Sequence, residues 1–328
     1  MLLQVKRKIK LFWDRIRMFG EFFCDYIEYS RWNYNSRKIS TQNAYEAKIL
    51  RQAHIIEKGL SLSKPRKGFG QSKIFELFSM MDEYIALGFS VETISFKNAV
   101  YVLRAYISFQ DNIGYQNEKI NTKLSSYFSY IDIEELGAGI TYTTREKMEL
   151  CKDKSFPVFF TSRHSIRQFD DKKVSLDDIK KAVEIAKKAP SACNRQASKV
   201  YFYESPDINK QIGQLIAGNK GFEDEVKNYL VLTADISAFY DTFERNQLYI
   251  EAGMMAMALI EALHYYGIAS CILQNGEYHK KNRKFKKICK NIPENEKIVL
   301  FIAIGYYKEK FSYAVSLRKP TEEVLIIN

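Results

Sequence analysis

The 328-residue sequence is poor in the residues that build metal centres and disulfide frameworks. Its histidines and cysteines are few and scattered: His54, His164, His264 and His279, and Cys24, Cys151, Cys193, Cys271 and Cys289. No C-x-x-C pair and no H-E-x-x-H helix occurs, so the usual zinc spacings are missing. An odd number of dispersed cysteines also does not suit a disulfide framework. We therefore expect reduced thiols and no metal.

Long apolar runs are also missing. The stretch Ala252–Ile260, bounded by Glu251 and Glu261, is well short of the ~18 apolar residues that a membrane-spanning helix needs. The N-terminus has charges among its apolar residues and no small-residue cleavage site, unlike a secretory signal. We expect a cytoplasmic protein with no transmembrane segment.

Three common catalytic and nucleotide-binding motifs are missing as well. Neither G-x-G-x-x-G nor G-x-x-x-x-G-K-[ST] occurs, and G-x-S-x-G does not occur either. The sequence thus lacks the usual fingerprints of a dinucleotide-binding fold, a P-loop ATPase and an α/β-hydrolase.

Positive charge, in contrast, is abundant and unevenly placed. The formal net charge is +11, and residues 1–38 contain nine Lys/Arg against four Asp/Glu. A second basic run, 279–290, fits a solvated helix face with Phe285, Ile288 and Cys289 turned inward. It has no aromatic-plus-basic motif for nucleic acid, so no nucleic-acid partner is expected.

The basic N-terminal stretch has the pattern of an amphipathic helix. Apolar residues recur at spacings of three and four, with lysines and arginines on the other faces: Val5, Ile9, Phe12, Ile16, Phe19, Phe23 and Ile27. Such a helix suits a membrane surface, because acyl chains accept the apolar side and anionic head groups attract the cations. Packing on the chain's own core or on a second subunit is the alternative interpretation.

The first 150 residues have a mostly helical pattern, which predicts an α-helical region at 1–150. Within it, one helix stops at Gly59 and a loop rich in Lys, Arg, Gly and Pro follows. Lys64, Arg66 and Lys67 could hold an anionic ligand there, or this could be an ordinary exposed loop.

Helix and strand patterns alternate in the second half, which predicts an α+β domain at 151–328. The expected elements are helices at 175–188 and 244–266 and strands at 199–203, 229–234, 269–273 and 298–306. Four clusters of polar residues fall among them: R163-H-S-x-R, APSACNRQ at 189–196, ILQNG at 272–276 and LRKP at 317–320.

In this order and spacing, the four clusters resemble the nitroreductase family of FMN-dependent oxidoreductases over residues 162–324. The resemblance implies an FMN-binding mixed sheet flanked by helices. It also implies that Arg163 and Ser165 bind the FMN phosphate and ribityl chain beside His164, and that Arg167 approaches the N1/O2 edge of the ring. Arg318 would complete the phosphate site.

The other two clusters would contact the flavin ring. By resemblance, Asn194 bonds the pyrimidine edge, and Pro190, Ser191 and Ala192 come from the other subunit of a homodimer. The segment Ile272, Leu273, Gln274 and Asn275 would lie over the ring. A backbone N–H, at Gln274 or Asn275, would donate to N5, so these two residues are the catalytic candidates. Several family members have an acidic residue at the position of Gln274.

The resemblance implies ping-pong hydride transfer from NADH or NADPH through flavin N5 to a small-molecule acceptor. Long helical N-terminal regions of this kind resemble those of nitroreductase-like proteins linked with surface-polysaccharide biosynthesis. Two alternatives stay open. The flavin fold could serve substrate dehydrogenation or flavin fragmentation, or the chain could be a non-catalytic, membrane-peripheral binding module anchored through residues 1–38.

Overall fold

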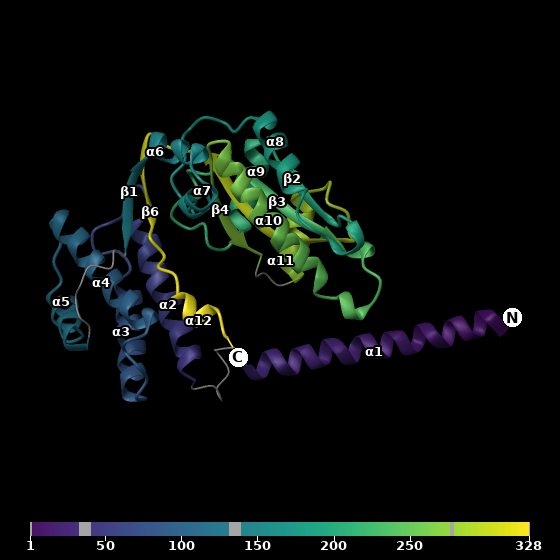
Figure 1. The fold of residues 1–328 in the computed structure, drawn as a ribbon, viewed down its shortest axis with the longest axis horizontal. Helices are drawn as coiled ribbons and strands as arrows, with labels where there is room; N and C mark the ends of the chain where they lie inside the picture. Colours follow the sequence, from purple (N-terminus) through teal and green to yellow (C-terminus); the bar gives the residue numbers. More distant parts are fainter. Residues whose placement is uncertain (1, 33–40, 131–138, 276–278, 328) are drawn as a thin grey trace.

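The computed structural model describes residues 2–32, 41–130, 139–275 and 279–327. Figure 1 shows three parts: a long N-terminal helix, a helical region, and a sheet covered by helices on both faces. The α+β architecture expected from the sequence is confirmed. The tail of residues 1–38 and the basic run 279–290 are described in part, since Met1, residues 33–38 and the side chains of 279 and 280 lie outside the described residues.

The helical region has its own apolar core. Its helices are α2 (Gln42–Leu60), α3 (Gln71–Ala86), α4 (Ile94–Asn112) and α5 (Glu118–Ser125). Thr41, Thr93 and Asn117 cap the starts of α2, α4 and α5 with their side chains, each accepting from a backbone N–H of the first turn. Ile49 and Ile56, one face of α2, are almost fully buried. Burial of each such side chain contributes on the order of 1.5–3 kcal/mol.

The second region is built on a four-stranded antiparallel sheet. Its strands are β2 (Ser198–Phe202), β3 (Asn228–Asp235), β4 (Ile268–Gln274) and β5 (Glu296–Tyr306), in the order β2-β3-β5-β4. Parallel pairing enters only through a single bridge, Ser165 to Ser270. The expected mixed sheet therefore has four antiparallel strands and one parallel edge segment among the described residues.

Alternate residues of the central strands face opposite helical layers. Leu230 of β3 and Ile302 of β5 pack against α8 (Leu176–Ala186) and α10 (Gln247–Tyr265). Val231 and Phe301 pack on the other side, with α9 (Pro206–Leu215) and α11 (His279–Ile288). The period of two in a strand explains why these central strands are apolar throughout.

A smaller sheet connects the two regions. Strand β1 (Ile140–Thr144) pairs antiparallel with β6 (Lys310–Ala314), in the register Ile140 to Ala314. The chain after β6 runs beside α2 to the short helix α12 (Thr321–Val324), as Figure 1 shows. The segment after β6 thus contacts the N-terminal region, through Ser316 with Glu57 and Lys319 with Glu46. The boundary near residue 150 stays a prediction.

Helix α1 (Leu2–Trp32) lies apart from the helical region and runs along one side of the sheet region in the view of Figure 1. It is joined to the segment before α10 by ion pairs, from Arg245 to Asp25 and Glu21 and from Arg17 to Asp241. Its large apolar side chains are exposed, including Phe12 at 60% and Phe19 at 72%. Within the described chain this helix therefore does not pack on the chain's own core, and packing on a second subunit stays a prediction. No helix in the described ranges is long and apolar enough to span a membrane.

Candidate functional site

The motif R163-H-S-x-R lies along one edge of the main sheet. It follows α7 (Phe156–Ser162), and the backbone N–H of Ile166 donates to the carbonyl of Ser270 in β4 at 2.9 Å. Ile166 and Phe169 are buried in the core, whereas Ser165 is exposed. Buried apolar residues thus fix the motif against β4, while the Ser165 side chain stays accessible.

Three basic residues gather at the start of this motif. Arg163 pairs with Glu261 of α10, with its Nε 3.0 Å from Oε1. The His164 ring stacks on Tyr313 with centroids 3.7 Å apart and an interplanar angle of 15°. Burial and the nearby charges of Arg163 and Arg318 lower the pKa of His164 to about 4. The structure therefore brings Arg163, His164 and Arg318 together, with His164 uncharged at neutral pH.

Hydrogen bonds connect the segment that carries Arg318 to helix α2. Arg318 donates from Nη1 to the carbonyl of Ser316 at 2.8 Å. Ser316 has a positive φ of 51°, and its backbone N–H and hydroxyl donate to the buried carboxylate of Glu57. Glu57 also lies 3.2 Å from Nδ1 of His54. The strained turn at Ser316 is thus held by the N-terminal region.

Arg167 is a buried cation whose hydrogen bonds are incomplete. Its residue is 6% exposed, and its Nε is buried with no hydrogen-bond partner. The remaining contacts are long: Nη1 donates to the carbonyl of Ser165 at 3.4 Å, and Nη2 is 3.5 Å from Nε2 of His54. A buried guanidinium without a carboxylate is costly, so this position fits a ligand that offers hydrogen-bond acceptors. The N1/O2 edge of FMN has that chemistry.

The end of β4 supplies the segment Ile272–Asn275. Ile272 is 39% exposed and Leu273 is 5% exposed, while Gln274 pairs in register with Leu300 of β5. The Asn275 amide donates to Asn282 at 2.8 Å and to the carbonyl of Ile298 at 2.9 Å. The Asn275 side-chain N–H groups therefore hold the strand end, while its Oδ1 is buried with no hydrogen-bond partner.

The segment Pro190–Asn194 is exposed for the most part and adopts an unusual backbone. Cys193, Asn194 and Gln196 all have positive φ, between 51° and 55°. Such conformations are costly for residues with a Cβ and concentrate at functional sites. Among the bonds holding the segment, the backbone N–H of Ala192 donates to the buried Glu251 at 2.8 Å, and the amide of Gln196 donates to Oδ1 of Asn194 at 3.1 Å.

The motif R163-H-S-x-R and the segment Pro190–Asn194 are bound at different positions along helix α10. Glu261, the partner of Arg163, and Glu251, the partner of Ala192, are ten residues apart in α10. At 1.5 Å per residue they are separated by roughly 15 Å along its axis. The structure thus brings the motif, Arg318 and β4 together, and it places Pro190–Asn194 apart from the start of the motif.

Sequence reasoning missed three residues of the site, all in α2. His54 lies 3.5 Å from Arg167, and Glu57 accepts a hydrogen bond from Ser316. The positive charge of Arg167 lowers the pKa of Lys58. Lys64, Arg66 and Lys67 in the following loop are exposed instead, and their anion-binding role stays a prediction. The spacing of four between His54 and Lys58 was the available signal, because it puts both on one helix face.

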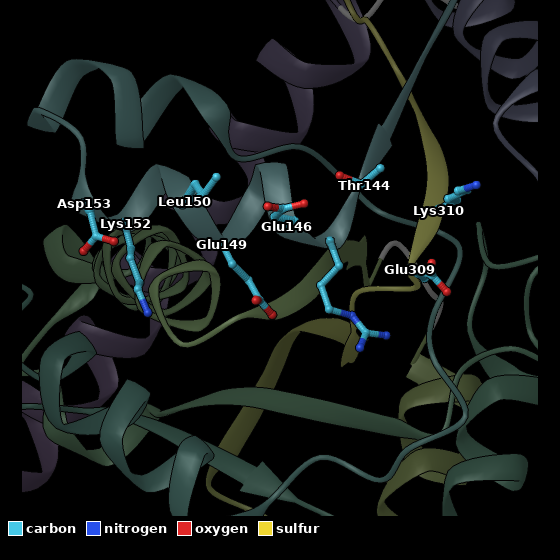
Figure 2. A pocket seen from close by; sticks show the side chains of 9 residues that line it. Thr144, Glu146, Glu149, Leu150, Lys152, Asp153, Glu309 and Lys310 are labelled. Atoms are coloured by element: carbon cyan, nitrogen blue, oxygen red, sulfur yellow. The ribbon is translucent and has the colours of Figure 1, made fainter.

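A pocket of about 460 Å³ lies elsewhere. It is shown in Figure 2 and is lined by charged and polar side chains from β1, α6 (Arg145–Glu149), the turn after it and the start of β6. Its lining residues are Thr144, Arg145, Glu146, Glu149, Leu150, Lys152, Asp153, Glu309 and Lys310. None of the predicted site residues is among them, so the pocket is separate from the candidate site.

No group of three or more His, Cys, Asp or Glu side chains suited to a metal ion occurs in the ranges that the structure describes. The candidate site is therefore a cluster of arginines and backbone groups at the edge of an antiparallel sheet. This arrangement defines a domain that can bind an anionic, aromatic ligand.

Comparison with known proteins agrees with this class. The model of the nitroreductase family matches residues 160–306. The chain is 29% identical over 195 residues to a Streptococcus pyogenes protein described as a candidate NAD(P)H nitroreductase, covering 50% of this chain and 94% of that protein. It is 23% identical over 215 residues to the iodotyrosine deiodinase of Nematostella vectensis, covering 56% and 78%.

Solved structures include an FMN-dependent nitroreductase from Clostridium difficile, with 21% identity, a TM-score of 0.44, and coverage of 52% of this chain and 97% of that one. Residues 160–306 form a nitroreductase family domain, and a largely helical region of about 150 residues precedes it. The family predicted from the four clusters is thus confirmed.

Proposed function

We propose that the chain is an FMN-dependent NAD(P)H oxidoreductase that transfers hydride in ping-pong fashion to a small-molecule acceptor. The observation that carries this proposal is Arg167, a buried guanidinium with an unpartnered Nε beside β4 in a domain of the nitroreductase family. When bound, FMN would supply the hydride chemistry at its N5 atom. The protein would contribute binding, orientation and electrostatics.

The residues at the start of the motif suit the phosphate of FMN. Arg163 and Arg318 each present several N–H donors, which match phosphate oxygens in geometry and charge. His164 lies between them as a neutral ring, because its pKa is lowered to about 4 by burial and by these two charges. It can therefore donate one N–H without adding another charge. The exposed Ser165 hydroxyl serves the ribityl chain.

The ring end of the site is assigned to β4 and Arg167. The Asn275 side chain is already engaged with Asn282 and Ile298, so the donor to N5 in this proposal is a backbone N–H at Gln274 or Asn275. Ile272, which is partly exposed, supplies an apolar surface for the ring, and the neighbouring Leu273 is packed in the core. Gln274 is exposed and faces the acceptor side.

The proposed enzyme is a homodimer with shared flavin sites. Glu251 of α10 binds the segment that contains Pro190, Ser191, Ala192 and Asn194, and Glu261 of the same helix binds Arg163. These two glutamates are ten residues apart, which is roughly 15 Å along the helix axis. An Asn194 amide at the ring edge is therefore best supplied by the second subunit.

Subunit complementation tests the shared site. Arg163→Ala and Asn194→Ala homodimers are each expected to bind FMN weakly. After subunit exchange in an equal mixture, half of the dimers carry both variants, and each of these has one intact site, or about a quarter of all sites. Tight FMN binding at about that stoichiometry supports sharing. A mixture that binds no better than the two separate variants contradicts it.

Steady-state kinetics test the reaction type. With NADH or NADPH and a quinone or nitroaromatic as surrogate acceptor, double-reciprocal plots should give parallel lines. Intersecting lines would reject ping-pong transfer. If FMN binds but neither nicotinamide is oxidised, substrate dehydrogenation or flavin fragmentation becomes the better account. The link with surface-polysaccharide biosynthesis stays a prediction.

We also propose that helix α1 binds an anionic membrane surface. Its exposed aromatic side chains, such as Phe19, accompany basic residues in the first third of the helix: Lys6, Arg7, Lys8 and Lys10. The full chain should sediment with vesicles containing phosphatidylserine, and a variant lacking residues 1–38 should not. Equally weak sedimentation of both would reject this contact and the membrane-anchored binding module.

A further inference from the structure

Lys58, in the last turn of α2, reaches from the N-terminal region into the flavin domain. Its Nζ donates to the carbonyl of Gly218 and lies 5.4 Å from the centroid of the Phe222 ring. On the same face of α2, His54 lies four residues before Lys58 and 3.5 Å from Nη2 of Arg167. Burial lowers the pKa of Lys58, and so does the positive charge of Arg167. Two basic side chains from distant parts of the chain meet at this point.

The Lys58 and Arg167 pair lacks a carboxylate partner. In the described ranges no Asp or Glu is within salt-bridge distance of either side chain, and Arg167 is 6% exposed. Glu223 is near enough to favour the charged form of Lys58, but its carboxylate accepts from the backbone N–H of Gly221. Two like charges, one buried and one partly buried, are costly together unless an anion faces them.

The pair also lies close to the end of β4. A Cβ at Gly218, whose carbonyl Lys58 binds, would be 3.7 Å from Cδ2 of Leu273. Lys58 thus lies near Arg167 and near the core-facing side of β4, the strand whose end the proposed function places over the flavin ring.

We infer that Lys58 is a flavin-site residue supplied by the N-terminal region, and that it acts with Arg167 on the N1/O2 edge of the ring. This inference rests on the proposed function. Reduction of FMN places negative charge on that edge, and two adjacent cations stabilise it. His54, 3.5 Å from Arg167 and 3.2 Å from Glu57, positions the guanidinium. The helical region is then a part of the active site.

The test compares Lys58→Met, Lys58→Arg and Lys119→Gln in the full chain, where Lys119 is an exposed control in α5. The readouts are the dissociation constant of oxidised FMN and the midpoint potential of the bound flavin. Lys58→Met should weaken binding of reduced FMN about tenfold more than binding of oxidised FMN, which is a fall of about 30 mV for a two-electron couple. Lys58→Arg and Lys119→Gln should keep the wild-type potential.

An unchanged potential in Lys58→Met would overturn the inference, and so would an equal fall in Lys58→Arg, because charge would then not be the cause. A wild-type protein that binds no FMN would instead reject the proposed function itself. The outcomes are therefore distinguishable.

A measurement on the wild-type protein covers the case in which Lys58→Met does not fold. Amine acylation followed by peptide mass spectrometry should show Lys58 protected by FMN and Lys119 modified equally with and without it. Equal modification of Lys58 in both conditions would contradict a position at the flavin ring.

Discussion

The carboxylate of Glu57 accepts hydrogen bonds from the backbone N–H of Ser316 at 2.9 Å and from its hydroxyl at 3.3 Å, across 259 residues of sequence. Glu57 is 1% exposed, and Ser316 carries a left-handed φ of 51°. This contact orients the turn from which Arg318 reaches His164. The N-terminal region therefore shapes the phosphate end of the candidate site.

Glu57→Gln should weaken FMN binding about tenfold. The substitution replaces a charge-assisted acceptor by a neutral amide, a loss of about 1.5 kcal/mol, and the turn at Ser316 loosens. Fluorescence titration of FMN checks the affinity. Glu92→Gln, at an exposed position before α4, is the matched control and should bind FMN like the wild type. Equal affinity of both variants would reject the role of Glu57.

Arg163→Ala should weaken FMN binding by about 1.5–3 kcal/mol, because it removes a charge-assisted bond to phosphate. It also leaves Glu261 without its ion-pair partner, and burial already raises the pKa of that carboxyl. Arg163→Ala/Glu261→Gln separates the two effects, since it should regain stability without regaining affinity. Arg104→Ala, exposed on α4, serves as the control. Unchanged affinity in Arg163→Ala would remove Arg163 from the phosphate site.

The flavin-free protein should lose stability as the pH falls from about 7 to about 4. His164 and His264 both have a folded pKa lowered to about 4 from 6.5, in each case chiefly by burial. The unfolded chain binds protons at these groups first, so their stabilisation is complete above pH 6.5 and is lost toward pH 4. Urea denaturation across this range measures the slope. His164→Phe, which keeps a ring against Tyr313, should flatten it, and an unaltered slope would contradict the assignment.

Cys193→Gly should leave stability unchanged or raise it by up to about 1 kcal/mol, because glycine adopts a φ of 52° without strain. Cys193→Val should lower it by about 1–2 kcal/mol, since β-branched residues are poorly suited to this region. Chemical denaturation gives both values. FMN affinity of Cys193→Gly should match the wild type, and a large loss would give the thiol a role that the proposal lacks.

Local sequence patterns predicted the elements well where periodicity is strong. The strand at β3 and the helix at α8 were predicted near their observed bounds. The predicted start of α10 at Glu244 was wrong, because Asp241 caps a separate turn of 3-10 helix, Thr242–Glu244, and α10 begins at Gln247. The hydrophobic pattern continues across that break, so periodicity alone could not reveal it.

Only part of the candidate site could be predicted from the sequence, because the rest depends on contacts between distant segments of the chain. The motif R163-H-S-x-R and Arg318 carry recognisable residue types, so the sequence named them. Lys58 and Glu57 read as ordinary polar positions of an amphipathic helix, and their significance depends on Gly218 and Ser316, which are far along the chain. Helix periodicity shows that two residues share a face, but it cannot show which distant segment packs there.

The most direct test of the account is the visible absorption spectrum of the purified full chain, recorded anaerobically before and after NADH and then NADPH. The account predicts a yellow protein with a flavin spectrum that bleaches with one of the two donors. A colourless protein that cannot be reconstituted with FMN would contradict it.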